Sequence, residues 1–152
     1  MSKRPVTEPD RQSVRKFMDT KSNIDPRDYA ALDRPEVLSL LFHPVKVPRN
    51  QGPTGSVDHD IPVADGVTVA ARFHLPEEKG GANIIFFHGN GELVIDYDEV
   101  GPSFVEQGVG FIVIDYRGYG WSGGQPSVTS MIADSHKVFD YVKEQDNSRG
   151  GR

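Results

Sequence analysis

Ile-Ile-Phe-Phe-His-Gly-Asn-Gly at residues 84–91 and Phe-Ile-Val-Ile-Asp-Tyr-Arg-Gly at residues 111–118 decide the fold of this chain. Each stretch is an unbroken apolar run that ends in polar residues and glycine, which is typical of strands covered on both faces in a parallel sheet. Parallel strands need a crossover connection. Residues 96–107 supply a helix, with apolar residues at helical spacing and Gly108 as its end. The two stretches therefore predict a βαβ unit.

Two further strands precede this unit, at residues 57–63 and 67–75. They are joined through an Asp-Gly pair, which tolerates the positive φ angles of a hairpin turn. The second strand alternates apolar and polar residues, which predicts one buried face and one face in water that carries Arg72 and His74. The expected fold class is α/β, with an antiparallel β-hairpin leading into the parallel βαβ unit and helices at its flanks.

The remaining segments surround a central domain at residues 57–145. Residues 1–30 are polar, mixed in charge and contain three prolines, so they are expected to form a mobile leader. Residues 31–56 are expected to hold a short helix and a loop. Residues 146–152 show no periodicity and are expected to form an unstructured tail.

Two polar residues mark the starts of predicted helices. Asp33 precedes Pro35 and Glu36, a pattern in which the aspartate caps the helix that follows. Ser127 precedes a run whose apolar residues recur at every third or fourth position, so it is predicted to cap the last helix.

The composition limits the classes of partner. Seventeen basic and 22 acidic residues give the 152-residue chain a net charge of -5, so nothing in its charge favours nucleic acid or an anionic membrane. The chain has no cysteine, which excludes disulfides and thiolate metal sites and favours the cytoplasm. No apolar run approaches the ~18 residues of a membrane span. The histidines form no closely spaced pair, so no metal site is expected. No cofactor is expected either.

The order of these motifs resembles that of a known family. A hairpin, a strand, His-Gly-Asn-Gly-Glu, a helix, a strand, Asp-Tyr-Arg-Gly-Tyr-Gly-x-Ser-x-Gly and a helix resemble the first half of α/β-hydrolases of the serine esterase and peptidase type, over about residues 57–144. Complete relatives would cleave an ester, thioester or amide through an acyl-serine intermediate. The resemblance implies a partial α/β-hydrolase domain, its N-terminal half only, which lacks the nucleophile elbow and the later strands of the triad. Such a truncated chain is expected to have no autonomous catalysis.

The resemblance also assigns roles to the residues of a first loop. His88, Gly89, Asn90 and Gly91 would form an oxyanion loop, in which Asn90 donates a backbone N–H to the substrate carbonyl and His88 orients the loop. The two glycines lack a Cβ and permit the backbone to approach a ligand closely. Glu92 is predicted only to favour the positive end of the following helix.

A second loop is predicted to be a salt-bridged scaffold formed by Asp115, Arg117, Gly118 and Gly120. It contains a Gly-x-Ser-x-Gly match at residues 120–124, but an elbow serine stands directly between strand and helix, whereas Ser122 is separated from both. Ser122 and His136 are the catalytic candidates within the chain. However, His136, Asp134 and Asp140 share one predicted helix, which is a poor arrangement for a triad. A Gly-x-Gly-x-x-Gly match in the same loop lacks the context of a dinucleotide site.

The strand at residues 83–87 is expected to be an open edge. In the resembled fold it lies inside the sheet, beside the strand that carries the nucleophile, and here that strand has no counterpart. An apolar edge without charges is a template for pairing with another chain. The expected partners are a complementary C-terminal hydrolase fragment or a second copy. The alternative function is a non-catalytic interaction module that binds a protein through this edge.

Overall fold

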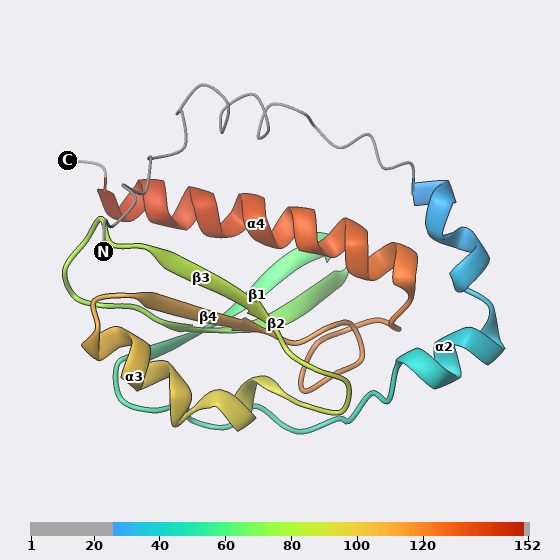
Figure 1. The fold of residues 1–152 in the computed structure, drawn as a ribbon, viewed down its shortest axis with the longest axis horizontal. Coiled ribbons are helices and arrows are strands. Elements are labelled where there is room, and N and C mark those ends of the chain that lie inside the picture. The colour runs from blue at the N-terminus through green and yellow to red at the C-terminus, as the bar shows by residue number, and fades with distance from the viewer. Residues whose placement is uncertain (1–25, 151–152) are drawn as a thin grey trace, which may run out of the picture.

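The computed structural model describes residues 26–150 as a four-stranded mixed sheet between helices (Figure 1). The elements in chain order are the 3-10 helix η1 (Pro26–Leu32), α2 (Pro35–Leu41), β1 (Ser56–Ala64), β2 (Val67–His74), β3 (Asn83–Phe87), the 3-10 helix η2 (Val94–Tyr97), α3 (Val100–Glu106), β4 (Gly110–Ile114) and α4 (Val128–Gly150). No helix in this part of the chain is long and apolar enough to cross a bilayer.

The strand order β1-β2-β4-β3 contains both predicted units. β1 and β2 form the antiparallel hairpin, and Gly66 in its turn has φ 67°, a value that side chains disfavour. β4 pairs antiparallel with β2 and parallel with β3, with Ile84 opposite Phe111. The predicted fold class is therefore confirmed. Since β3 pairs only with β4 among the described strands, it is also an edge of the sheet, as expected.

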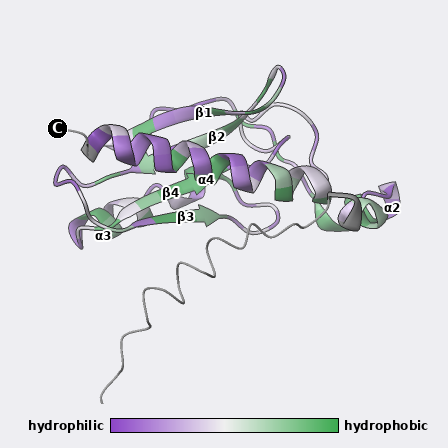
Figure 2. Cartoon of the chain, turned by 90° about the horizontal axis from the view of Figure 1, so that it is seen from above, coloured by the Kyte–Doolittle hydropathy of each residue, from purple (hydrophilic) through white to green (hydrophobic). Residues whose placement is uncertain are grey.

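Helices cover both faces of the sheet. α4 packs on one face, where a core of strand side chains closes around Val138 and Val142. η2 and α3 pack on the other, around Val94, Phe111 and Val113. Figure 2 shows α4 lying along the sheet, with β3 and β4 coloured as hydrophobic strands. This layered arrangement explains the unbroken apolar run of β4, whose residues are all buried, whereas the residues of β3 are only partly covered and Ile84 is exposed.

The prediction that one face of β2 lies in water is wrong. Arg72 is fully buried and His74 is 3% exposed. β2 lies between β1 and β4, and the crossover formed by η2 and α3 covers the face that carries both side chains. Gly101 lets α3 approach closely, since a Cβ at this position would lie 2.3 Å from the His74 ring. Burial lowers the pKa of His74, which therefore favours the neutral ring.

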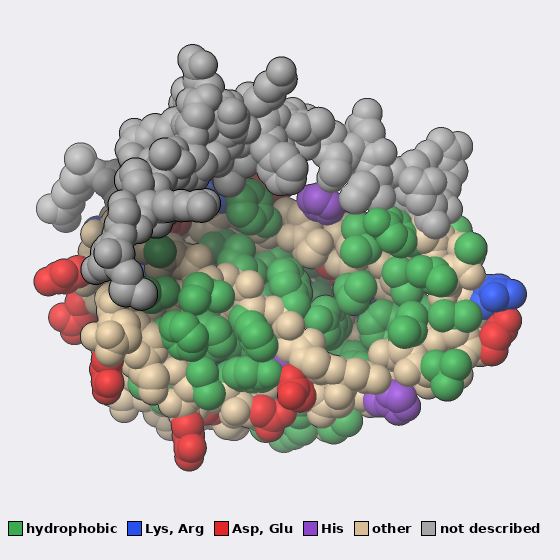
Figure 3. Space-filling model, in the orientation of Figure 1, with side chains coloured by type: hydrophobic (Ala, Val, Ile, Leu, Met, Phe, Trp, Pro, Cys, Tyr) green, Lys and Arg blue, Asp and Glu red, His purple; other side chains and the backbone are tan. Residues whose placement is uncertain are grey.

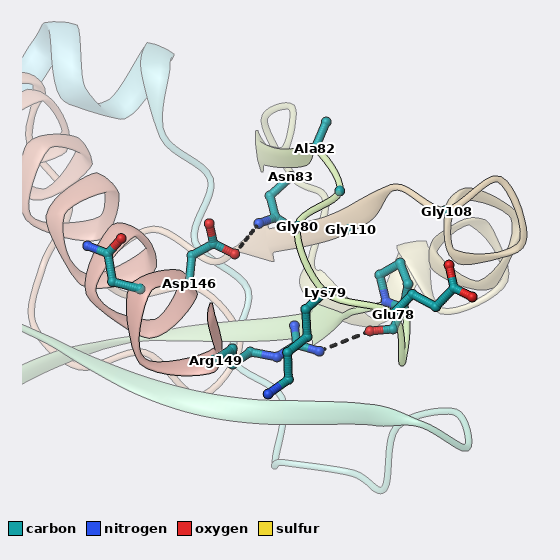
Figure 4. A pocket seen from close by; sticks show the side chains of 12 residues that line it. Glu78, Lys79, Gly80, Ala82, Asn83, Gly108, Gly110, Asp146 and Arg149 are labelled. Atoms are coloured by element: carbon teal, nitrogen blue, oxygen red, sulfur yellow. Dashed lines mark hydrogen bonds between the residues drawn. The ribbon is translucent and has the colours of Figure 1, made fainter. Parts of the chain in front are cut away.

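The described helices extend beyond the predicted domain limits at both ends. Residues 26–30 were expected in the leader but belong to η1, which packs against α4. Residues 146–150 were expected in the tail but continue α4. Asn83 donates to Asp146 (Nδ2–Oδ1 3.0 Å) and Arg149 donates to the carbonyl of Pro76 (2.9 Å), and these bonds hold the last turns of α4 (Figure 4). Residues 1–25 and 151–152 lie outside the described residues.

One of the two predicted caps serves a different helix. Asp33 accepts the N–H of Val128 (2.8 Å) and of Thr129 (3.2 Å), and so it caps α4, while α2 begins after Arg34 without a side-chain cap. Ser127 caps α4 as predicted, because its Oγ accepts the N–H of Ser130 at 3.0 Å. The contact of η1 with α4 places Asp33 at this helix start, which no local pattern could reveal.

Candidate functional site

Two loops meet where the parallel strands β3 and β4 end. Ligands of parallel sheets bind outside the carboxyl ends of the strands, so a site is expected there. Residues 88–92, named the oxyanion turn after the role expected from the sequence, follow β3, and residues 115–124, the glycine loop, follow β4. The recess drawn in Figure 4 lies at the opposite ends of these strands, beside Asn83 and Gly110, and is separate from both loops.

The tip of the oxyanion turn is a tight reverse turn. The N–H of Glu92 donates to the carbonyl of Gly89 at 3.2 Å, and Gly91 has φ 83°, which a type II turn requires at its third residue. The carboxylate of Glu92 in turn accepts the N–H of Gly89 (2.7 Å) and the hydroxyl of Tyr97 (2.6 Å). These two bonds lower the pKa of Glu92, while burial and Glu92 raise the pKa of Tyr97 to about 12. Glu92 therefore closes the turn, a role beyond the helix-end effect expected from the sequence.

His88 and Asp115 join the two loops in the interior. Both side chains are fully buried, and His88 Nε2 lies 3.0 Å from Asp115 Oδ1. His88 Nδ1 lies 2.9 Å from the carbonyl of Gly89, and the same oxygen of Asp115 accepts the N–H of Val94 at 2.8 Å. The hydroxyl of Tyr116 donates to the carbonyl of His88 at 2.9 Å. The base of the oxyanion turn is thus fixed both through the side chain of His88 and through its backbone carbonyl.

Asn90 occupies the exposed tip of the oxyanion turn. Its backbone N–H has no acceptor among residues 26–150, whereas its side-chain amide is bonded to His43 and Tyr119. The N–H groups of Gly89 and Glu92 are occupied, so Asn90 and Gly91 are the residues of this turn whose N–H groups have no acceptor within residues 26–150. His43 was not singled out in the sequence, because no pattern connects it with a turn 47 positions away.

The glycine loop is held by several elements, as a structural scaffold would be. Arg117 makes a two-pronged ion pair with Asp134 of α4, at 2.6 and 2.7 Å, and this bond raises the pKa of the arginine. Gly118 donates to the carbonyl of Gly123 at 3.0 Å, and Gly120 donates to the carbonyl of Val45 at 2.8 Å. Asp115, the other charged residue of this loop, lies against His88 rather than Arg117.

Ser122 lies in the interior of the glycine loop. Its side chain is 1% exposed, and its Oγ accepts the N–H of Ala70 (2.8 Å) and donates to the carbonyl of Asp115 (3.1 Å). The hydroxyl of Ser122 thus bonds to the backbone of β2 at Ala70 and to the backbone of the glycine loop at Asp115. His136 lies exposed on α4 and shares no hydrogen bond with Ser122 among the described residues. The structure does not unite these two candidates.

Comparison with known proteins finds similarity to serine aminopeptidases in sequence and to an esterase in fold. The family model for S33 serine aminopeptidases matches residues 78–150. The uncharacterized protein YfhR of Salmonella typhi and that of Salmonella typhimurium are each 31% identical over 80 residues, which cover 53% of this chain and 27% of theirs. The chain thus spans about a quarter of the length of these curated relatives. An esterase structure from Pyrococcus furiosus is similar in fold, with a TM-score of 0.51 and 17% identity over 66% of this chain and 42% of that chain. Over about half of its length, the chain therefore resembles the α/β-hydrolases.

Proposed function

We propose that this chain supplies the oxyanion half of a serine hydrolase site for an ester, thioester or amide. One observation carries the proposal: the backbone N–H of Asn90 is unoccupied among the described residues, at the carboxyl end of β3, in a turn fixed by Glu92 and His88. Attack on a carbonyl carbon places negative charge on its oxygen, and N–H donors already aimed at that oxygen stabilise the transition state.

The nucleophile is proposed to come from outside the described residues. Its hydroxyl would attack the carbonyl, a base would take the proton and return it to the leaving group, and Asn90 would bind the oxyanion together with a second N–H. The engagement of Ser122 with Ala70 and Asp115 supports this division, because a hydroxyl bonded on both sides to backbone is closed to a substrate. The 152-residue chain is thus proposed to be without autonomous catalysis.

The proposal is tested by reconstitution. The chain alone is expected to give no covalent labelling by a fluorophosphonate. Mixing it with a polypeptide of a relative that carries the serine elbow, acid and histidine should give labelling of that polypeptide and hydrolysis of a p-nitrophenyl ester. Asn90→Pro removes the N–H yet suits the second position of the turn, so kcat should fall about 10²–10³-fold. Asn90→Ala keeps the backbone N–H, so its kcat should fall less.

Two results would contradict this assignment. Labelling of the chain alone that disappears in Ser122→Ala would place catalysis within the chain. A reconstituted enzyme with equal kcat for Asn90→Pro and Asn90→Ala would show that the Asn90 N–H has no part in the reaction.

A second proposal, which also covers the non-catalytic alternative, concerns the β3 edge. Figure 3 shows hydrophobic side chains gathered on the side of the molecule where β3 lies, and Ile84 is 38% exposed. β3 carries no charge, whereas the opposite edge strand, β1, contains Asp58, Asp60 and Pro62, which hinder strand pairing. We infer that β3 pairs with a strand of a complementary fragment or of a second copy.

Light scattering at increasing protein concentration tests the edge. We expect concentration-dependent association of the chain alone, which Ile84→Lys should weaken by adding a charge to β3. Val57→Lys is the matched control, because Val57 is an exposed apolar residue of β1, at 57% exposure, and its replacement should leave association unchanged. A chain that stays monomeric at all concentrations, or equal effects of both variants, would argue against pairing through β3.

A further inference from the structure

We propose that His43 and Tyr119 are positioning residues for the backbone N–H of Asn90. The inference rests on the proposed oxyanion role of Asn90 and adds two residues from separate parts of the chain to the same site. It follows from a closed set of hydrogen bonds, from the rigidity of the elements that carry the bonds and from the openness of the tip of the turn.

The side chain of Asn90 is held by a ring of hydrogen bonds. Its Oδ1 accepts the N–H of His43 (3.0 Å) and the hydroxyl of Tyr119 (2.9 Å), and its Nδ2 lies 2.8 Å from His43 Nδ1. The N–H of His43 also donates to the Tyr119 hydroxyl at 2.8 Å. An amide nitrogen can only donate, so His43 Nδ1 is the acceptor and carries no proton in this arrangement. Both ends of the Asn90 amide are thus used.

The partners of Asn90 belong to rigid surroundings. Tyr119 is 1% exposed, and its ring packs on His88 and Tyr116 with centroids 5.5 and 5.7 Å apart. Burial raises the pKa of Tyr119, so its hydroxyl keeps the proton that it donates. The strand-like segment at residues 45–47 runs beside the glycine loop, through the bond from Gly120 to Val45 and a bridge at Lys46, and this places His43 over the turn.

The tip of the oxyanion turn has little other support. A Cβ at Gly91 would meet no atom within 4 Å, so the residue after Asn90 projects into open space. His88 and Glu92 fix the base of the turn, but their side chains bond to the backbone of Gly89 and not to Asn90. The ring with His43 and Tyr119 therefore sets the direction of the Asn90 N–H. Misplacement of a catalytic group by about 1 Å can cost roughly 10²-fold in rate, so this ordering matters to the proposed reaction.

Backbone ¹⁵N relaxation of the full chain tests the inference without any turnover. We expect an order parameter near about 0.85 for the Asn90 N–H, as in rigid backbone, falling below about 0.6 in His43→Ala and in Tyr119→Phe. His43→Asn should restore the rigid value, since its Oδ1 replaces Nδ1 as the acceptor. Tyr141→Phe is the control, because it removes a hydroxyl bonded to His59 at 3.0 Å, outside both loops.

An unchanged order parameter in His43→Ala, or a value below about 0.6 in the unmodified chain, would overturn the proposal. His43 is exposed, so His43→Ala remains informative if Tyr119→Phe should fail to fold. If reconstitution gives no hydrolase while Asn90 is rigid and depends on His43, the proposed function fails and the positioning stands. If Asn90 is rigid in every variant, the positioning fails independently of any activity.

Discussion

Arg72→Met is expected to lower the free energy of unfolding by about 3–5 kcal/mol, the usual loss when one partner of a buried ion pair is removed. Arg72 is fully buried and bonds to Asp58 at 2.7 and 3.0 Å and to Asp98 at 2.8 and 2.9 Å. Asp58 lies on β1 and Asp98 between η2 and α3, so the guanidinium joins the hairpin to the crossover. Without it, two carboxylates face each other with no cation.

Urea unfolding of matched variants measures this effect. Arg49→Met is the control, because Arg49 also lies over the Trp121 ring, at 5.2 Å against 5.6 Å for Arg72, but pairs with Asp60 at the surface. It should lose only about 0–1 kcal/mol. Adding Asp58→Asn and Asp98→Asn to Arg72→Met should recover part of the loss, since the repulsion is then removed. Equal losses for both arginines would mean that the burial of Arg72 has no energetic weight.

Gly120→Ala is expected to destabilise the fold by roughly 2–6 kcal/mol. Gly120 has φ 49°, and a side chain there costs about 1–3 kcal/mol of backbone strain. A Cβ would also lie 1.9 Å from Asp115 Oδ2, and such overpacking costs a further 1–3 kcal/mol or so. The carboxylate cannot withdraw freely, because it is buried and its other oxygen holds His88 and Val94.

Gly66→Ala separates the two causes of this loss. Gly66 has φ 67°, but a Cβ there meets no atom within 4 Å, so only the strain of about 1–3 kcal/mol remains. The difference between the two variants in thermal or urea unfolding therefore reports the contact with Asp115. If both lose the same free energy, Asp115 moves aside at no cost and does not fix the position of the glycine loop.

The sequence predicted those features of the fold that depend on residues close together in the chain. The apolar runs of β3 and β4 indicated strands covered on both faces, and the Asp-Gly pair placed the hairpin turn correctly. The burial of Arg72 could not be predicted in this way, because the alternation of apolar and polar residues in β2 is that of a strand with one face in water. That face is covered only by the packing of η2 and α3. The helical turn at residues 146–150 depends on Asn83 and Pro76, which are remote in the chain.

The candidate site, like the fold, could be predicted from the sequence only in part. Glycine spacing after an apolar run indicated the turn that presents Asn90, since that signal lies within a few residues. The bonds that hold Asn90 come from His43 and Tyr119, which are brought together only by the packing of residues 45–47 beside the glycine loop. Glu92 stands three residues after Gly89, but its role in closing the turn was not predicted, because an acid at a helix start already has a sufficient electrostatic explanation.

The unequal edges of the sheet limit how far self-association can proceed. If two copies joined through β3 about a two-fold axis, the combined sheet would end in β1 on both sides. Each outer strand would then present Asp58, Asp60 and Pro62, residues that discourage another strand from adding. Assembly of this geometry stops at a closed dimer and does not continue into a fibre.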